Sequence, residues 1–143
     1  MQDRDVTASA APALLRAGER TFRPYDMEGP VQPEMEWLPI SYDRETGQGS
    51  YLMRMDPGAV TIPHDHPWME EFLILEGELT DSNGCVYKAG DFVSYPPGSH
   101  HNSWTGPGCV IVVVEWPSPA QQRAARDPSA QGGPDPAGGR VTG

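Results

Sequence analysis

Residues 58–77 read GAVTIPHDHPWMEEFLILEG and residues 90–104 read GDFVSYPPGSHHNSW, and these two segments decide how the chain folds. They contain all four histidines of the chain, His64 and His66 in the first and His100 and His101 in the second. Histidine is the commonest protein ligand for transition metals, because its neutral imidazole binds through one ring nitrogen while a neighbouring group orients the other. Histidines that only faced solvent would have no reason to gather in two short segments. The sequence therefore predicts a metal site.

Strand geometry brings the candidate ligands together. Successive side chains of a strand alternate between its faces, so His64 and His66 project to one side, and Glu70 shares their parity. His101 must arrive from a strand distant in sequence, and the turn residues PPGS at 96–99 supply the approach. Three imidazoles and one carboxylate around a divalent ion leave a formal charge of about +1 and open positions for water or substrate. Neither segment contains cysteine, so the pattern favours a catalytic site over a closed structural zinc site.

Three neighbouring polar residues are expected to play other parts. His100 has the opposite strand parity to His101, so it should face outward or support a ligand from behind. Asp65 alternates away from the two histidines that flank it and should face solvent. Glu71 alternates away from Glu70 and is expected at the surface.

The spacing within both segments resembles the two signature motifs of the cupin superfamily. The first has Gly58, five residues, His-x-His, three residues, Glu, six residues and Gly77. The second has Gly90, five residues, Pro-x-Gly, two residues and His101. The spacing selects Glu70 over its neighbour and His101 over His100.

The resemblance extends over about residues 36–117. Asn is usual at the last position of the second motif, where this chain has Thr105; that Asn is not a metal ligand in the family, so the departure leaves the ligand set unchanged. The sequences of the segments EEFLILEGEL and PPGSHHNSW are most similar to the small cupin domains of zinc-binding anti-sigma factors of the ChrR type and to stand-alone dioxygenase-like relatives.

Strand signals along the chain agree with an all-β protein. An Asn-Gly pair at 83–84 is a strong hairpin signal. The expected strands cover residues 36–40, 49–55, 59–62, 70–75, 77–80, 85–87, 91–95 and 110–115. About eight short strands indicate a sandwich or barrel, and the resemblance implies a cupin double-stranded β-helix, a jelly-roll barrel with the metal inside its mouth. We expect an N-terminal arm at 1–35 with a short helix around 12–19, the cupin domain at 36–117, and a disordered Pro/Gly-rich tail at 118–143.

Strand parity also suggests which side chains line a substrate pocket. Tyr51 and Met53 share one face of their strand, and Phe72 and Ile74 share the parity of Glu70. Two tryptophans flank the ligands and could stack on a planar substrate, although ordinary core and rim packing explains them equally well. The predicted pocket residues are Trp68, Phe72, Ile74, Trp104, Tyr51 and Met53.

Composition limits the partners and the compartment. The 143 residues carry a formal net charge of −10, which argues against nucleic acid and anionic membranes, since both require a basic surface. The chain has no apolar run of membrane-spanning length and no signal-peptide pattern at its start, so we expect a cytoplasmic protein. Cys85 and Cys109 are then expected as two reduced thiols, with their pairing left open.

Function follows from the metal site and from the resemblance. The resemblance implies a mononuclear non-heme iron dioxygenase acting on a small enolisable or phenolic compound, with Fe(II) favoured over Zn, Mn or Ni. Glu70 would be both a metal ligand and the catalytic base. Two alternatives stay open: a non-catalytic metal-binding sensor or ligand-binding cupin, and a metal-dependent isomerase or lyase. The arm is short and without histidine or cysteine, which argues against an anti-sigma role, and a homodimer is expected by analogy with other cupins.

Overall fold

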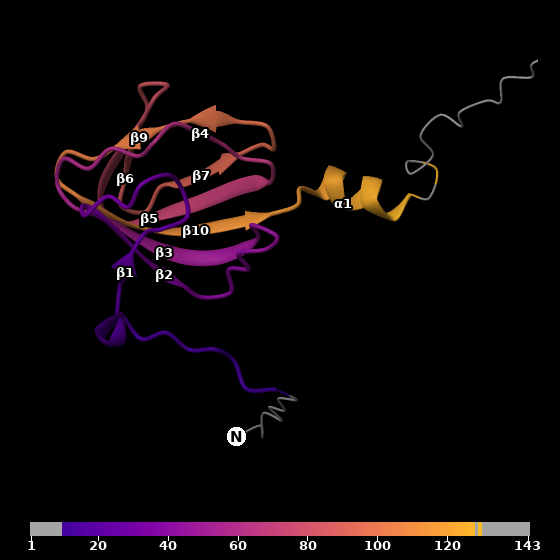
Figure 1. The fold of residues 1–143 in the computed structure, drawn as a ribbon, viewed down its shortest axis with the longest axis horizontal. Coiled ribbons are helices and arrows are strands. Elements are labelled where there is room, and N and C mark those ends of the chain that lie inside the picture. The colour runs from indigo at the N-terminus through magenta and orange to yellow at the C-terminus, as the bar shows by residue number, and fades with distance from the viewer. Residues whose placement is uncertain (1–9, 128, 130–143) are drawn as a thin grey trace, which may run out of the picture.

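A computed structural model of the protein describes residues 10–127 and residue 129. This part of the chain is built from short and long β-strands, with one 3-10 turn and one α-helix (Figure 1). The all-β prediction is therefore confirmed. In chain order, the elements are η1 (Ala17–Glu19), β1 (Arg23–Pro24), β2 (Met35–Pro39), β3 (Gly49–Met55), β4 (His64–Asp65), β5 (Met69–Asp81), β6 (Val86–Lys88), β7 (Phe92–Tyr95), β8 (His100–His101), β9 (Ser103–Trp104), β10 (Cys109–Trp116) and α1 (Pro119–Arg126).

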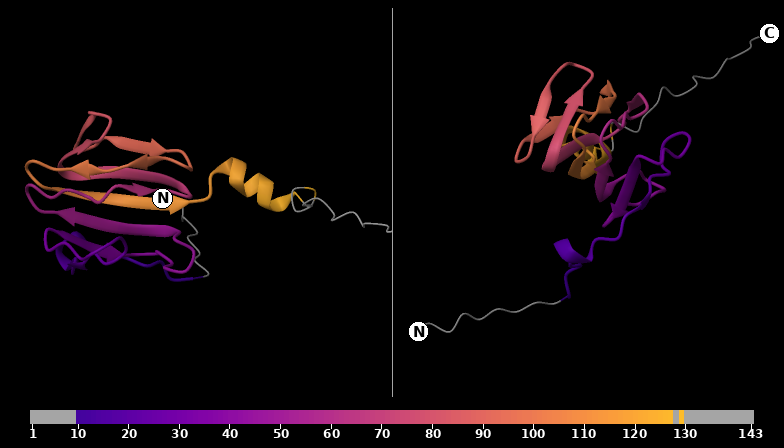
Figure 2. Two further views of the ribbon diagram at one scale, coloured as in Figure 1. Left: turned by 45° about the horizontal axis from the view of Figure 1, so that its top comes forward. Right: turned by 90° about the vertical axis from the view of Figure 1, so that its left-hand side faces the viewer.

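The strands form two facing layers that share β5. Strands β1, β2, β3, β10, β5 and β6 neighbour one another in that order, β7 and β9 also pair with β5, and β4 pairs with β8. In Figure 1, β2, β3 and β10 lie below the barrel interior and β4, β7 and β9 lie above it, and Figure 2 shows the same layers from two further sides. The 13-residue β5 is long enough to pair with β7 and β10 along its first part and with β6 and β9 along its second.

A one-residue bulge in β5 reverses which of its side chains face the interior. Across β10, the partners of two successive residues skip Leu75. Glu70 and Ile74 before the bulge are buried, whereas Leu79 and Asp81 are buried after it. The bulge therefore changes the inward positions of β5 from even to odd residue numbers.

Aromatic rings fill the part of the barrel next to β2 and β3. The indole of Trp37 is 0 % exposed, and the rings of Tyr25, Tyr42 and Tyr51 meet it edge-on with centroids 5.4, 5.6 and 5.5 Å away. This edge-to-face arrangement is a favoured aromatic geometry. Tyr25 belongs to the segment expected to be an arm, so that segment contributes to the core.

The N-terminal segment differs from its prediction in two respects. The helix expected around residues 12–19 is reduced to the 3-10 turn η1, which buries no residue. A stretch with so few apolar residues gains too little from packing to hold a longer helix. Further along, β1 pairs antiparallel with β2, so the ordered sheet begins at Arg23 and not at residue 36.

The segment after residue 117 was predicted to be a disordered tail, but its beginning is helical. Ser118 caps α1 by accepting a hydrogen bond from the backbone N–H of Gln121, and the Gln121 side chain accepts one from the backbone N–H of Ser118. This capping box and the proline in the first turn favour a helix start, which overall composition does not reveal. Residue 128 and residues 130–143 of the predicted tail lie outside the described residues.

Both cysteines are free: Cys85 is exposed and Cys109 is buried. Burial raises the pKa of the Cys109 thiol to about 11, so it is protonated at neutral pH. Neither helix in the described part of the chain is long and apolar enough to cross a membrane.

Candidate metal centre

The two histidine-containing segments form two short strands that pair with each other. In the antiparallel register of β4 and β8, His64 lies opposite His101 and Asp65 lies opposite His100. Residues directly opposite each other share a face of the sheet. His64 and His101 accordingly face the barrel interior, while His100 and Asp65 are exposed and hydrogen-bonded to each other, with 2.6 Å between Nδ1 and Oδ1. The expectation that these last two face outward is confirmed.

Four side chains converge inside the barrel. They are His64, His66, Glu70 and His101, and one ligand atom from each lies within 4.8 Å of all the others. The Nε2 atoms of His66 and His101 are 2.8 Å apart. Glu70 Oε2 lies 3.1 Å from His66 Nε2, and Glu70 Oε1 lies 3.4 Å from His101 Nε2. This group could hold a metal ion, as predicted.

An oxygen atom behind each imidazole orients its ring. The Nδ1 contacts are His64 with Ile62 O at 2.6 Å and Glu28 at 3.1 Å, His66 with Glu115 at 3.1 Å, and His101 with Asp81 at 3.0 Å. When Nδ1–H donates to such an oxygen, Nε2 carries the free lone pair and aims it at the centre. Nitrogen and carboxylate donors held in this way fit a divalent transition metal.

The same carboxylates raise the proton affinity of the imidazoles. Burial alone would lower the pKa of His101, but hydrogen bonds to Asp81 and Glu70 outweigh it and raise this pKa to about 9. Burial likewise opposes protonation of His66, yet its hydrogen bond to Glu115 and the charge of Glu70 raise its pKa. The centre therefore favours positive charge, which either protons or a metal ion can supply.

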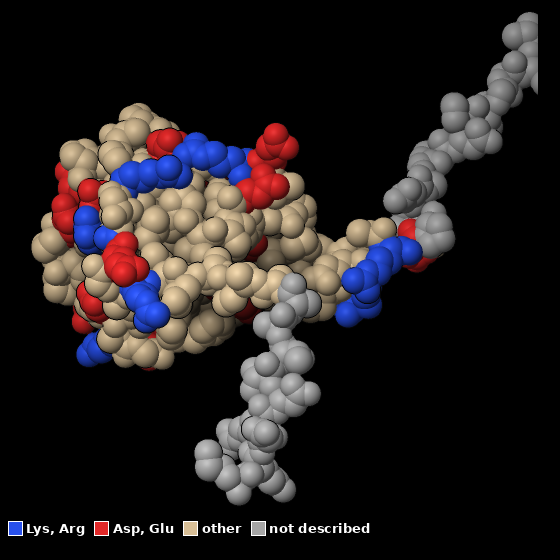
Figure 3. All heavy atoms as spheres, turned by 90° about the horizontal axis from the view of Figure 1, so that it is seen from below, with Lys and Arg blue, Asp and Glu red and all other residues tan. Residues whose placement is uncertain are grey.

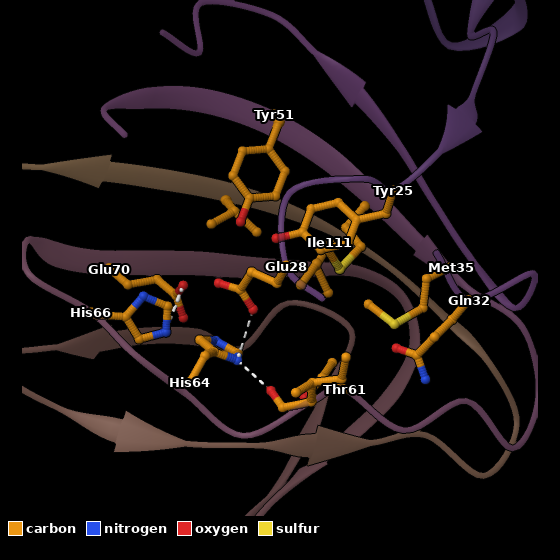
Figure 4. A pocket seen from close by; sticks show the side chains of 13 residues that line it. Tyr25, Glu28, Gln32, Met35, Tyr51, Thr61, His64, His66, Glu70 and Ile111 are labelled. Carbon is orange, nitrogen blue, oxygen red and sulfur yellow. Dashed lines mark hydrogen bonds and ion pairs between the residues drawn. The ribbon is translucent and has the colours of Figure 1, made fainter. Parts of the chain in front are cut away.

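A cavity of about 50 Å³ lies against the centre. His64, His66 and Glu70 form one wall, and the side chains of Tyr25 and Tyr51 project toward them from the other side (Figure 4). Burial raises the pKa of both phenols well above the usual range. Both therefore remain protonated at neutral pH and can donate hydrogen bonds into the cavity. Glu28, Gln32 and Thr61 also line the cavity. The rest of the lining is apolar: Met35, Met53, Ile62, Ile111 and Val113.

The structure brings only some of the predicted pocket residues to this cavity. Tyr51 and Met53 line it. Phe72 and Ile74 point inward but belong to the hydrophobic core, and they do not line the cavity. Trp68 lines a neighbouring hollow instead.

Trp104 does not line the cavity. Its side chain is 47 % exposed. Ser103 before it and Thr105 after it are both buried, so alternation along the chain turns Trp104 to the outside. Its predicted pocket role is wrong because proximity in sequence to His101 says nothing about the face on which a side chain lies. Thr105, the position that departs from the cupin motif, is buried and donates a hydrogen bond to Glu78 O while accepting one from Gly108 N–H.

Sequence reasoning missed three carboxylates that contact the histidines. Glu115 could have been found, since it shares the parity of the buried Ile111 and Val113. Asp81 could not have been found from the sequence, because the bulge in β5 reverses its orientation relative to Glu70. Glu28 comes from the loop between β1 and β2, where no spacing rule predicts its contact with a histidine.

The family of ChrR cupin-like domains matches residues 23–119. The match covers more than half of the chain, and the protein belongs to this family. The matched range begins at β1, in agreement with the sheet, and confirms the resemblance found in the sequence. A comparison with curated proteins gave no match.

Solved structures share the fold. An acetylacetone dioxygenase from Acinetobacter johnsonii superposes with a TM-score of 0.60 at 13% identity, over 80% of this chain and 80% of its own. An RmlC-like cupin from Shewanella frigidimarina superposes with a TM-score of 0.57 at 18% identity, over 76% of this chain and 94% of its own. A chain from the complex of SigE with the anti-sigma factor ChrR of Rhodobacter sphaeroides superposes with a TM-score of 0.54 at 18% identity. The superposition covers 71% of this chain and 52% of that chain. Likeness at these identities shows the fold alone, and it confirms the predicted cupin barrel.

Proposed function

We propose that the protein is a metal-dependent enzyme, and specifically a mononuclear non-heme iron dioxygenase acting on a small enolisable or phenolic compound. The observation that carries the proposal is the convergence of three imidazoles and the Glu70 carboxylate beside a cavity that has both tyrosines and apolar side chains in its lining. A site without thiolate ligands, built from nitrogen and carboxylate oxygen, suits Fe(II), and also Zn, Mn or Ni.

The cavity limits the size of the substrate. Its volume of about 50 Å³ is well below the roughly 300 Å³ at which pockets for drug-sized ligands begin. Only the reacting end of a compact molecule fits beside the ligands. The apolar side chains favour a neutral carbon skeleton at this position, because burying a charged group there would cost much of its hydration free energy.

The protein residues would bind the substrate and move its proton. When bound, Fe(II) would polarise a substrate oxygen and supply electron density for the reaction with dioxygen. Tyr25 and Tyr51 would donate hydrogen bonds to substrate oxygen atoms and fix their position. Glu70 lies at the border of the ligand cluster and the cavity, where its carboxylate can accept a proton from an enolisable carbon or a phenol.

The name of one structural neighbour supports the choice of assay. That protein is an acetylacetone dioxygenase, and acetylacetone is an enolisable diketone with seven non-hydrogen atoms. It is therefore a suitable first substrate for this chain.

The test is an oxygen-uptake assay on protein loaded anaerobically with Fe(II) and offered acetylacetone and small phenols. Oxygen consumption that matches substrate loss, and that requires iron, is the expected result. Substrate loss without oxygen consumption would replace the proposal with an isomerase or lyase. Tight metal binding without turnover of any enolisable or phenolic compound would favour the sensor function instead.

A further inference from the structure

A second hollow, of about 140 Å³, adjoins the cavity at the metal centre. Tyr25, Glu28 and His66 line both spaces, so these side chains lie between the two. The outer hollow is bordered by the loop that follows β2 and by the loop between β4 and β5, which contribute Tyr42 and Trp68. A ligand that passes between these side chains would reach from one space into the other. We call it the outer hollow.

Negative charge dominates the two spaces together. Their lining includes the carboxylates of Glu28, Asp65, Glu70 and Glu115, and no Lys or Arg of the described residues lines either space. Nearby Arg44 is neutralised by Asp26 at 2.7 Å. Elsewhere too, basic side chains lie beside acidic ones at the edge of the face shown in Figure 3.

Aromatic rings line the outer hollow beside these carboxylates. They belong to Tyr25, Tyr42 and Trp68. The indole N–H of Trp68 donates to Thr46 O at 2.8 Å, which holds the ring in place. From α1, the side-chain amide of Gln121 donates to the backbone oxygen of the residue before Trp68 at 3.0 Å. Aromatic faces beside carboxylates are the usual surroundings of a bound ammonium group.

We propose that the outer hollow binds an ammonium group, and that the substrate is a small organic cation whose uncharged end reaches the metal. This inference rests on the proposed function for the reaction itself, but not for binding. Carboxylates attract the cation and exclude anionic compounds, and the rings replace part of its hydration shell. The uncharged end then meets the apolar wall of the inner cavity.

The test compares three probes of almost the same shape that differ in charge. They are choline, the neutral 3,3-dimethyl-1-butanol and the anionic 2-hydroxyethanesulfonate, titrated by calorimetry into protein loaded with zinc. The last keeps the hydroxyl end and carries its negative charge where choline carries the ammonium group. We expect choline to bind at least tenfold more tightly than the neutral probe, and the anion to bind most weakly. Equal affinities, or tighter binding of either of the other probes, would overturn the proposal.

Variants then locate the binding site. Trp68→Leu should weaken choline binding at least tenfold, and Asp65→Asn should weaken it by a smaller factor, with the zinc content of both unchanged. Trp104→Leu is the matched control, because that tryptophan lies outside both spaces and should bind choline as the original protein does. Unchanged choline binding in Trp68→Leu would refute this location. If Trp68→Leu does not fold, the Asp65→Asn variant and the probe series on the original protein still test the proposed site.

The outcome is independent of the oxygenase assay. Lack of oxygen uptake with every substrate would contradict the proposed dioxygenase and leave the order of probe affinities as it is. Conversely, oxygen uptake with neutral diketones and no preference for choline would support the proposed dioxygenase and refute the proposed ammonium site.

Discussion

The Nε2 atoms of His66 and His101 lie 2.8 Å apart, although the residues are 35 positions apart in the sequence. Both rings are held from behind, by Glu115 and by Asp81. If both Nδ1 atoms carry the hydrogen, two lone pairs point at each other, which is unfavourable unless a cation lies between them. The pair is thus arranged for a proton or a metal ion, and neighbouring Glu70 supplies an anionic ligand.

Loss of an inward imidazole should remove the metal. His66→Ala is expected to lower the metal content of protein purified without chelators to a small fraction of the original, because it removes a central donor. His100→Ala is the control, since His100 is exposed and pairs with Asp65, and it should retain nearly all of the metal. Elemental analysis of both variants decides; equal loss in the two would contradict the assignment of His101 as the ligand from β8.

The carboxylate behind His101 should matter almost as much as a ligand. Asp81→Asn is expected to weaken metal affinity about 10- to 100-fold, the usual effect of removing a group that orients a metal-bound histidine. Asp65→Asn, whose partner faces solvent, should leave the affinity unchanged. Competition with a chelator of known affinity measures both constants, and equal affinities for the two variants would argue against the role of Asp81.

Acid should weaken metal binding, because protons compete for the same nitrogens. The pKa of His101 is raised to about 9 in the metal-free protein, so affinity should rise with pH up to that value. Because the folded pKa exceeds the unfolded value of about 6.5, protonated His101 stabilises the metal-free fold below pH 6.5, and this contribution is lost as pH rises toward 9. Thermal unfolding of metal-free protein across that interval should show the loss. A melting temperature that rises there instead would contradict this prediction.

Glu70 should separate metal binding from turnover. Glu70→Gln keeps the size of the side chain and one oxygen donor but loses the basic carboxylate, so we expect part of the metal to remain and oxygen uptake to fall about 100-fold or more. Turnover is to be divided by the bound metal in each preparation. A Glu70→Gln variant with unchanged turnover per metal would restrict Glu70 to a structural role.

The motif glycine Gly77 should be irreplaceable for packing. Its φ is +77°, and an added Cβ would lie 1.9 Å from the backbone oxygen of Gly108. Gly84 has a similar φ of +85° with open space around it, so Gly84→Ala should cost only the left-handed backbone penalty of about 1–2 kcal/mol. Gly77→Ala should cost at least about 2 kcal/mol more in the free energy of unfolding. Denaturant titration of the two variants tests this difference, and equal costs would show that β10 can move away.

The C-terminal boundary of the fold shows where sequence patterns were insufficient. Composition after residue 117 is rich in Pro and Gly, and it concealed the capping residues Ser118 and Gln121 that start α1. Trp104 shows a second limit, since closeness in sequence to His101 suggested a shared pocket while alternation placed the two on opposite faces.

Patterns in the sequence predict the all-β class, the cupin motifs and the four side chains that converge, His64, His66, Glu70 and His101. These follow from local rules: the alternation of side chains along strands and the fixed spacing of ligands and turns. Which oxygens orient the imidazoles and where the cavities lie depend on how the strands pack in three dimensions. Asp81 faces the site because one extra residue in β5 shifts its register against β10. Such a shift depends on the partner strand, whose position no local pattern contains.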